Sequence, residues 1–224
     1  MNKTEVKSKS IIFSTKMVKA ILEDRKTMTR RTKGLNKINK TPDEWEVPFQ
    51  GEMLGGYTIA FRNKKTLETI GIKCLYKIGQ ILWVKETHYR HGKWVKNGKT
   101  KTGKQKWHFL AINITCIKYC DNQPDNIRKN SYRKEGWYKK PSIFMYRVFS
   151  RSKLEITAVR CERLQDITEE DAKKEGVWGK DEPYQGVGDL PTDRFQDLWD
   201  SINGKKAPWS SNPFVLVISF KRIK

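Results

Sequence analysis

The feature that most constrains the fold is the last apolar run of this 224-residue chain, Asn212–Ile223, with the sequence NPFVLVISFKRI. A run of β-branched and aromatic residues bounded by a proline and by basic residues is typical of a β-strand. Two shorter apolar runs, at residues 10–14 and 81–84, predict further strands. At residues 152–165, Leu154, Ile156 and Ala158 alternate with Glu155 and Thr157, which predicts a strand with one buried face.

Three helices are predicted between the strands. Ser14 can cap the first, which ends near Asp24, a residue that tolerates the left-handed conformation. The second, at residues 166–176, opens with the capping-box pattern of Thr168 and Asp171 and has Gly176 where a C-terminal glycine belongs. Apolar residues recur on one face of the first and third helices: Met17, Val18, Ile21 and Leu22, and then Phe195, Leu198, Trp199 and Ile202.

The order of these elements is strand, helix, strands, helices, strand, with mostly non-helical connections. This order predicts an α+β fold, a small curled sheet flanked by helices. Residues 51–63 predict a hairpin, and residues 1–9 predict a disordered basic lead before a single domain at 10–224.

The net charge of +21, with a pI near 9.8, favours a polyanionic partner. Lysines and arginines bind nucleic acid by displacing condensed counterions. The alternative is a general lysine bias of the source proteome. No apolar run approaches the roughly 20 residues of a membrane span, and the N-terminus lacks the apolar core of a signal peptide, so an intracellular, cytoplasmic protein is expected. The spacing of the four cysteines predicts free thiols rather than a zinc site.

The charge is concentrated in one stretch. Residues 90–118 hold eight Lys or Arg and no acidic residue, with aromatic residues between them. They predict a hairpin with Asn97-Gly98 at its tip. Phosphate contacts and base stacking would use Lys93, Trp94, Lys104, Lys106 and Trp107. The alternative is an edge hairpin that lysines protect from aggregation. Residues 121–142, a polar and basic stretch that contains proline, predict a loop.

A second basic stretch, Asp24–Arg31 with the sequence DRKTMTRR, combines a lysine with two threonines. A lysine whose pKa falls well below about 10.4 can activate a threonine hydroxyl. The neighbouring cations Arg25, Arg30 and Arg31 would lower the pKa of Lys26. On a flat strand, however, Lys26 and Thr29 would point to opposite faces, so they converge only in a turn, a bulge or the tail of a helix.

Five segments in the correct order resemble the ASCH domain family, and most closely its phage and prophage proteins. They are ILEDRKTMTRR, GQILWVKETH, LEITAVRCERLQDITEEDAKKEGV, FQDLWDSINGK and NPFVLVISFKR. The resemblance implies a PUA-like fold, a small mixed β-barrel with helices, that recognises RNA or a modified nucleotide in a cleft. It leaves residues 33–78 and 90–150 as insertions, and it implies the cytoplasm of a bacterial or phage-infected cell.

One bacterial branch of this family hydrolyses N4-acetylcytidine with an Arg-Lys-Thr-x-Thr motif and a later glutamate. The matching positions are Arg25, Lys26, Thr27, Thr29 and Glu175. The resemblance implies that Thr29 attacks, Lys26 activates it and Glu175 handles the leaving nitrogen, without metal or cofactor. The chain departs from the branch at two positions, where Asp24 replaces a glycine and Arg30 an apolar residue.

Two readings stay open. The chain is either an amidohydrolase of acylated cytidine or a non-catalytic module that binds RNA or DNA. Candidate binding residues outside the hairpin are Arg25, Thr27, Arg30, Arg31, Lys85 and Glu86. Glu175 has its own alternative, because a carboxylate at a helix C-terminus opposes the helix dipole and could simply be neutralised by Lys173 and Lys174. The sequence predicts no oligomeric state.

Overall fold

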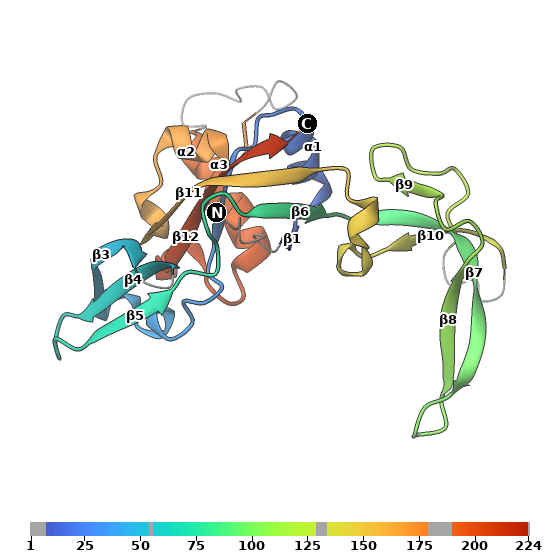
Figure 1. Ribbon diagram of the computed structural model, residues 1–224, viewed down its shortest axis with the longest axis horizontal. Helices are drawn as coiled ribbons and strands as arrows, with labels where there is room; N and C mark the ends of the chain where they lie inside the picture. Colours follow the sequence, from blue (N-terminus) through green and yellow to red (C-terminus); the bar gives the residue numbers. More distant parts are fainter. Residues whose placement is uncertain (1–7, 54–55, 129–133, 179–189, 224) are drawn as a thin grey trace, which may run out of the picture. The chain divides into compact units, whose positions relative to one another are not determined.

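The computed structural model describes residues 8–53, 56–128, 134–178 and 190–223. It divides into two compact units (Figure 1). Unit 1 comprises residues 1–9, 20–82 and 152–224, and unit 2 comprises residues 10–19 and 83–151. The α+β class is confirmed, because strands in three sheets make up most of the regular structure and helices are few. No closed barrel occurs among the described strands, so the PUA-like barrel remains a prediction.

A five-stranded sheet has the order β1-β6-β11-β12-β2. Its strands are β1 (Lys9–Ile12), β6 (Ile81–Lys85), β11 (Lys153–Arg163), β12 (Phe214–Ile223) and β2 (Met28–Arg31). β12 pairs antiparallel with both β11 and β2, and its first five residues are fully buried. The last apolar run is therefore a central strand, as its composition predicts.

β11 contains an irregularity that the alternation pattern does not reveal. The register with β12 shifts between Ile156 and Ala158. Leu154 and Ile156 are buried as predicted, but Ala158 is exposed, and Val159 and Cys161 take the inward positions. The prediction for Ala158 was wrong because a β-bulge inserts one residue and reverses the alternation beyond it.

The helices are α1 (Thr15–Leu22), α2 (Glu169–Lys174) and α3 (Pro191–Asn203). The Met17 amide donates to Ser14 Oγ at 3.4 Å, and the Asp171 amide donates to Thr168 Oγ1 at 3.2 Å, so both predicted caps are present. α3 buries Phe195 and Trp199 against a core that includes Met28 of β2, but Ile202, predicted on the same face, is exposed. No described helix is long and apolar enough to cross a membrane.

A second sheet in unit 1 has the order β3-β4-β5 and contains the hairpin predicted at residues 51–63. Its strands are β3 (Trp45–Met53), β4 (Gly56–Asn63) and β5 (Thr69–Lys73). Single-turn 3-10 helices complete the chain: η1 (Ile38–Lys40), η2 (Pro42–Glu44), η3 (Ser142–Phe144), η4 (Arg147–Phe149), η5 (Leu164–Asp166) and η6 (Trp209–Ser211).

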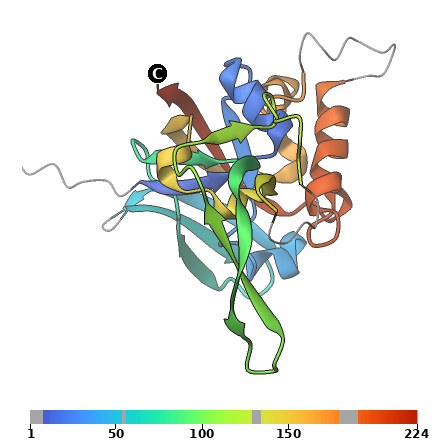
Figure 2. The same ribbon diagram turned by 90° about the vertical axis from the view of Figure 1, so that its right-hand side faces the viewer.

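The sheet of unit 2 is built on one long strand, β7 (His88–Lys99). β7 pairs with β8 (Gln105–Ala111), β9 (Ile117–Tyr119) and β10 (Gly136–Lys140). The β7–β8 hairpin is present (Figure 2), but its turn lies at residues 100–104, where the Thr100 amide donates to the Lys104 carbonyl at 2.7 Å. Asn97-Gly98 does not form the tip as predicted, because Gly98 uses its positive φ at a register shift between Lys96 and Lys99. β10 lies in a stretch predicted to be a loop.

Candidate functional site

Lys26 lies in a tight turn between α1 and β2. Asp24 has a φ of 56°, and the amides of Arg25 and Lys26 both donate to the Ala20 carbonyl, at 2.9 and 3.0 Å. This confirms the predicted left-handed end of the first helix at Asp24. Because β2 begins only at Met28, strand alternation does not separate Lys26 from Thr29.

Glu175 follows α2 and meets Lys26. Lys26 Nζ lies 2.6 Å from Glu175 Oε2 and donates to the Glu175 backbone carbonyl at 2.7 Å. The two side chains are 0% and 3% exposed. The Thr27 amide donates to the Lys174 carbonyl at 2.9 Å, which fixes the end of α2 against the turn. The fold thus brings together two of the three expected reacting groups, in a dry environment.

Gly176 makes this close approach possible. Its φ of 83° lies in the left-handed region, as expected for a glycine that ends a helix. A Cβ at this position would lie 2.9 Å from Lys26 Cβ and 3.0 Å from Ala20 Cβ. The glycine is therefore required by its backbone conformation and by the space that the Lys26 turn occupies.

The environment changes the acidity of Lys26. Burial lowers the pKa of Lys26, Glu175 opposes this, and the charges of Arg31 and Arg30 lower the pKa further. Two of the three arginines expected to act in this way do so, but burial is the larger cause. A lowered pKa is what a lysine needs to act as a base near neutral pH.

Thr29 is buried in β2, opposite Ile218 of β12 in the antiparallel register. Its neighbours Met28 and Arg30 point to the other face of the sheet, where Met28 joins the core and Arg30 lies 5.6 Å from the centroid of the Phe195 ring. The hydroxyl therefore lies on the face of β2 that α3 does not cover.

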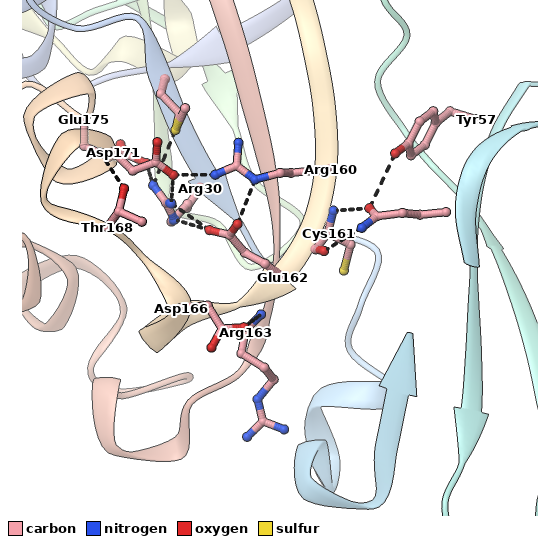
Figure 3. Close-up of polar contacts among 12 residues, drawn as sticks. Arg30, Tyr57, Arg160, Cys161, Glu162, Arg163, Asp166, Thr168, Asp171 and Glu175 are labelled. Carbon is pink, nitrogen blue, oxygen red and sulfur yellow. Dashed lines mark hydrogen bonds and ion pairs between the residues drawn. The ribbon is translucent and has the colours of Figure 1, made fainter. Parts of the chain in front are cut away.

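Arg30 connects Glu175 to two further carboxylates (Figure 3). Its guanidinium lies 2.7 Å from Glu162 Oε1, 2.8 Å from Asp171 Oδ2 and 3.3 Å from Glu175 Oε1. Since the Arg30 side chain is fully buried and engaged with three acids, it positions Glu175 rather than facing a ligand in solution.

Arg160 completes this cluster. It donates to Glu162 Oε2 at 2.7 Å and also contacts Asp171 Oδ2. Burial works against ionisation of Asp171, but Arg30 and Arg160 outweigh it and hold the pKa of Asp171 below its ordinary value. Lys26, Arg30 and Arg160 thus face three carboxylates. Sequence reasoning missed Glu162, Asp171 and Arg160 as partners, because nothing in the spacing of β11 and α2 shows that they meet.

Arg25 and Thr27 lie at the surface beside this cluster. They line a hollow of about 440 Å³ together with Lys173, Lys174 and Trp178. Arg25 donates to the backbone carbonyls of Gly176 and Trp178, at 3.3 and 3.2 Å. Arg31, the last residue of β2, is half-buried, and this burial lowers its pKa.

Lys85 and Glu86 belong to unit 2 and do not form a solvated pair with each other. Glu86 is buried and accepts two hydrogen bonds from Arg151, both at 2.8 Å. Lys85 Nζ donates to the Ile143 carbonyl at 2.6 Å. Both residues therefore hold unit 2 together.

The candidate binding residues of the hairpin differ in position and exposure. Trp94 and Trp107 line a hollow in the sheet of unit 2. Lys104 and Lys106 are exposed beyond it, and Lys93 of β7 is partly buried. Lys140, a further residue of the hollow, was missed because its strand was predicted to be a loop.

A scan against protein-family models, a search of curated proteins and a search of solved structures each found no match to this chain. The structure defines a mixed α+β protein with a buried lysine–glutamate pair, and Thr29 follows the lysine of this pair by three residues, on β2. Membership of the ASCH family remains a prediction.

Proposed function

We propose that this protein is an ASCH-like, PUA-related amidohydrolase that removes the acetyl group from N4-acetylcytidine or a similarly acylated base. The observation that carries the proposal is the 2.6 Å contact between Lys26 Nζ and Glu175 Oε2, close in sequence to Thr29 and held in a buried setting. A buried ion pair is costly to maintain, because both charges lose their hydration. A function that uses both groups gives a reason for its presence.

A proton transfer within the Lys26–Glu175 pair would supply the base and the acid that the reaction needs. Transfer of one proton from Lys26 Nζ to Glu175 Oε2 converts the ion pair into a neutral amine and a carboxylic acid, the forms that a base and an acid require. Burial favours this neutral form, since it removes two charges from a dry site. Arg30 and its other carboxylates hold Glu175 in position during the exchange.

The reaction has two balanced steps. Thr29 Oγ attacks the acetyl carbon, its proton passes to Lys26, and Glu175 protonates the exocyclic nitrogen as the C–N bond breaks. This releases cytidine and leaves an acetyl ester on Thr29. Lys26 then returns its extra proton to Glu175, and a water molecule attacks the ester and gives one proton to Lys26. Lys26 passes this proton to the departing Thr29 oxygen as the ester bond breaks, which re-forms the hydroxyl, and the acetic acid that is released ionises to acetate.

The test is incubation of the full chain with N4-acetylcytidine, both as the free nucleoside and within RNA, with release of acetate measured. Thr29→Val keeps the size of the side chain and removes the hydroxyl, so turnover should fall by at least about a hundredfold. Thr69→Val, at an exposed position of β5, is the matched control and should retain full turnover. Equal turnover in both variants, or no acetate from any substrate, would remove the catalytic role.

A further inference from the structure

The sheet of unit 2 carries a hollow of about 570 Å³ on one face. Trp94 and Phe109 form part of its wall, and they lie opposite each other in the β7–β8 register. Gly92 leaves room for this arrangement, because a Cβ there would lie 2.6 Å from Phe109 Cζ and also collide with the Leu110 carbonyl. The aromatic wall is thus built by the regular pairing of two strands.

Cations also line the hollow. Lys140 Nζ lies 3.4 Å from the centroid of the Phe109 ring and 4.0 Å from that of Trp94. Arg90 is 7% exposed and lies 4.4 Å from the centroid of the Phe149 ring. His88 and Lys139 also line the hollow, and none of its described lining residues is acidic.

No acidic side chain among the described lining residues neutralises the charges of Lys140 and Arg90. Burial, with a smaller contribution from Arg90, lowers the pKa of Lys140 to about 8. The Nε of Arg90 is buried without a hydrogen-bond partner in the part of the chain described by the structure. An anionic group that entered the hollow would therefore gain two poorly compensated positive charges.

Aromatic surface extends to the rim. Trp107 lines the hollow, and Phe144 and Tyr146 at its edge are 66% and 68% exposed. Exposed aromatic rings beside cations are the surface on which unpaired bases stack while the backbone phosphates meet lysine and arginine. The bases of a duplex are already stacked and paired, so they cannot enter such a hollow.

The positive charge of the surrounding sequence favours a polyanionic partner. Residues 83–151 contain 17 Lys or Arg and four Asp or Glu, a net charge of +13. A protein partner for an apolar hollow would not require this excess, whereas a polyanion would.

We propose that this hollow binds single-stranded nucleic acid, with one unpaired base against Trp94 or Trp107 and an adjacent phosphate on Lys140 and Arg90. The inference is independent of the proposed hydrolysis, because all of these residues belong to unit 2 and none takes part in the Lys26 cluster. Binding of nucleic acid in this hollow would explain the positive charge of the hairpin.

The experiment measures binding of a dye-labelled, mixed-sequence RNA of ten nucleotides to the full chain by fluorescence anisotropy, between about 50 and 200 mM salt. Lys140→Gln should weaken binding about tenfold and reduce the slope of log affinity against log salt by about 0.7. Lys101→Gln, at the exposed turn of the same hairpin, removes the same charge outside the hollow and should weaken binding less than about threefold.

Stacking is tested separately. Trp107→Leu should weaken binding about tenfold, whereas Trp107→Phe should retain most of the affinity. The same RNA annealed to its complement should bind at least about tenfold more weakly. Thermal melting of each variant checks that unit 2 stays folded.

Three outcomes would overturn the inference: equal losses in Lys140→Gln and Lys101→Gln, equal affinity for single strand and duplex, or saturation of the hollow by a free nucleotide as tightly as by the RNA. Acetate release from free N4-acetylcytidine by Lys140→Gln should match the unsubstituted protein, so failure of either proposal is recognised separately.

Discussion

Glu175 lies 149 residues after Lys26, yet its Oε2 is 2.6 Å from Lys26 Nζ in the buried region between the α1–β2 turn and the end of α2. The contact depends on three local features of the chain: the left-handed Asp24, the glycine after Glu175, and the arginine that holds the second carboxylate oxygen. The contact itself, the glycine and the arginine each lead to a prediction.

Glu175→Gln should destabilise the protein by about 3–5 kcal/mol, because it leaves the buried Lys26 without its counter-charge. The measurement is urea unfolding at pH 7. Glu170→Gln on α2 is the control: its contact with Lys174 at 3.9 Å is exposed, so the expected change is below about 0.5 kcal/mol. Equal effects of the two substitutions would show that the buried pair contributes no more than a surface pair.

Gly176→Ala should be more destabilising than Gly79→Ala. Both glycines have positive φ, at 83° and 76°, so both substitutions carry backbone strain. Only at Gly176 would the new Cβ meet Lys26 and Ala20, whereas nothing lies within 4 Å of a Cβ at Gly79. The difference in unfolding free energy between the two variants should be about 1–3 kcal/mol. A difference near zero would mean that the Lys26 turn moves away freely.

Arg30→Lys should lower stability by about 2–3 kcal/mol, because an ammonium cannot reach three carboxylates as the planar guanidinium does. It should also lower kcat for acetate release more than it raises KM, since Arg30 positions Glu175 without contacting substrate. Arg62→Lys is the control: its exposed contact with Glu46 should contribute less than about 0.5 kcal/mol. A rise in KM alone would instead indicate that Arg30 binds substrate.

The stability of unit 2 should depend on pH through Lys140. In the folded protein the pKa of Lys140 is about 8, below its ordinary value of 10.5. Between these values the unfolded chain binds more protons, so the contribution of Lys140 to stability improves as the pH rises from 7 to 10. Lys140→Met should therefore show a smaller rise, or a larger fall, in melting temperature over this range than the unsubstituted protein.

Nucleic-acid binding should show the opposite dependence. Deprotonation of Lys140 above pH 8 removes a phosphate contact, so affinity for single-stranded RNA should fall with rising pH. Arg90 stays charged across this range, and burial lowers the pKa of His88 below its ordinary value, so neither changes its charge above pH 8. A parallel loss of affinity in Lys140→Met would assign the effect to another group.

Local signals in the sequence predicted several features of the fold. The run at Asn212–Ile223, the cap at Ser14, the left-handed Asp24 and the final glycine at Gly176 all depend on neighbours within a few residues, and all occur as predicted. The predictions that were wrong concern features that depend on the pairing of strands. The bulge that exposes Ala158 and the shift of the hairpin turn away from Asn97-Gly98 are set by the partner strand, which the local pattern does not contain.

The candidate sites also contain residues that the sequence indicates and residues that it does not. The family resemblance pointed to Lys26, Thr29 and Glu175, but the ion pairs of Arg30 with Glu162 and Asp171 join positions more than 130 residues apart and have no sequence signal. Lys140 belongs to a strand that begins in a polar, glycine-containing stretch. Its significance comes only from the aromatic rings placed beside it by β7 and β8.

The most direct test of the central claim is a search for the acetyl group on Thr29 itself. The full chain is mixed with N4-acetylcytidine in a single turnover, quenched in acid within milliseconds to seconds, and its peptides are analysed by mass spectrometry. The account predicts a transient acetyl ester on the peptide that contains Thr29, which disappears as acetate forms and is missing from Thr29→Val. Turnover without any acetylated Thr29, at every quench time and at low temperature, would contradict the account.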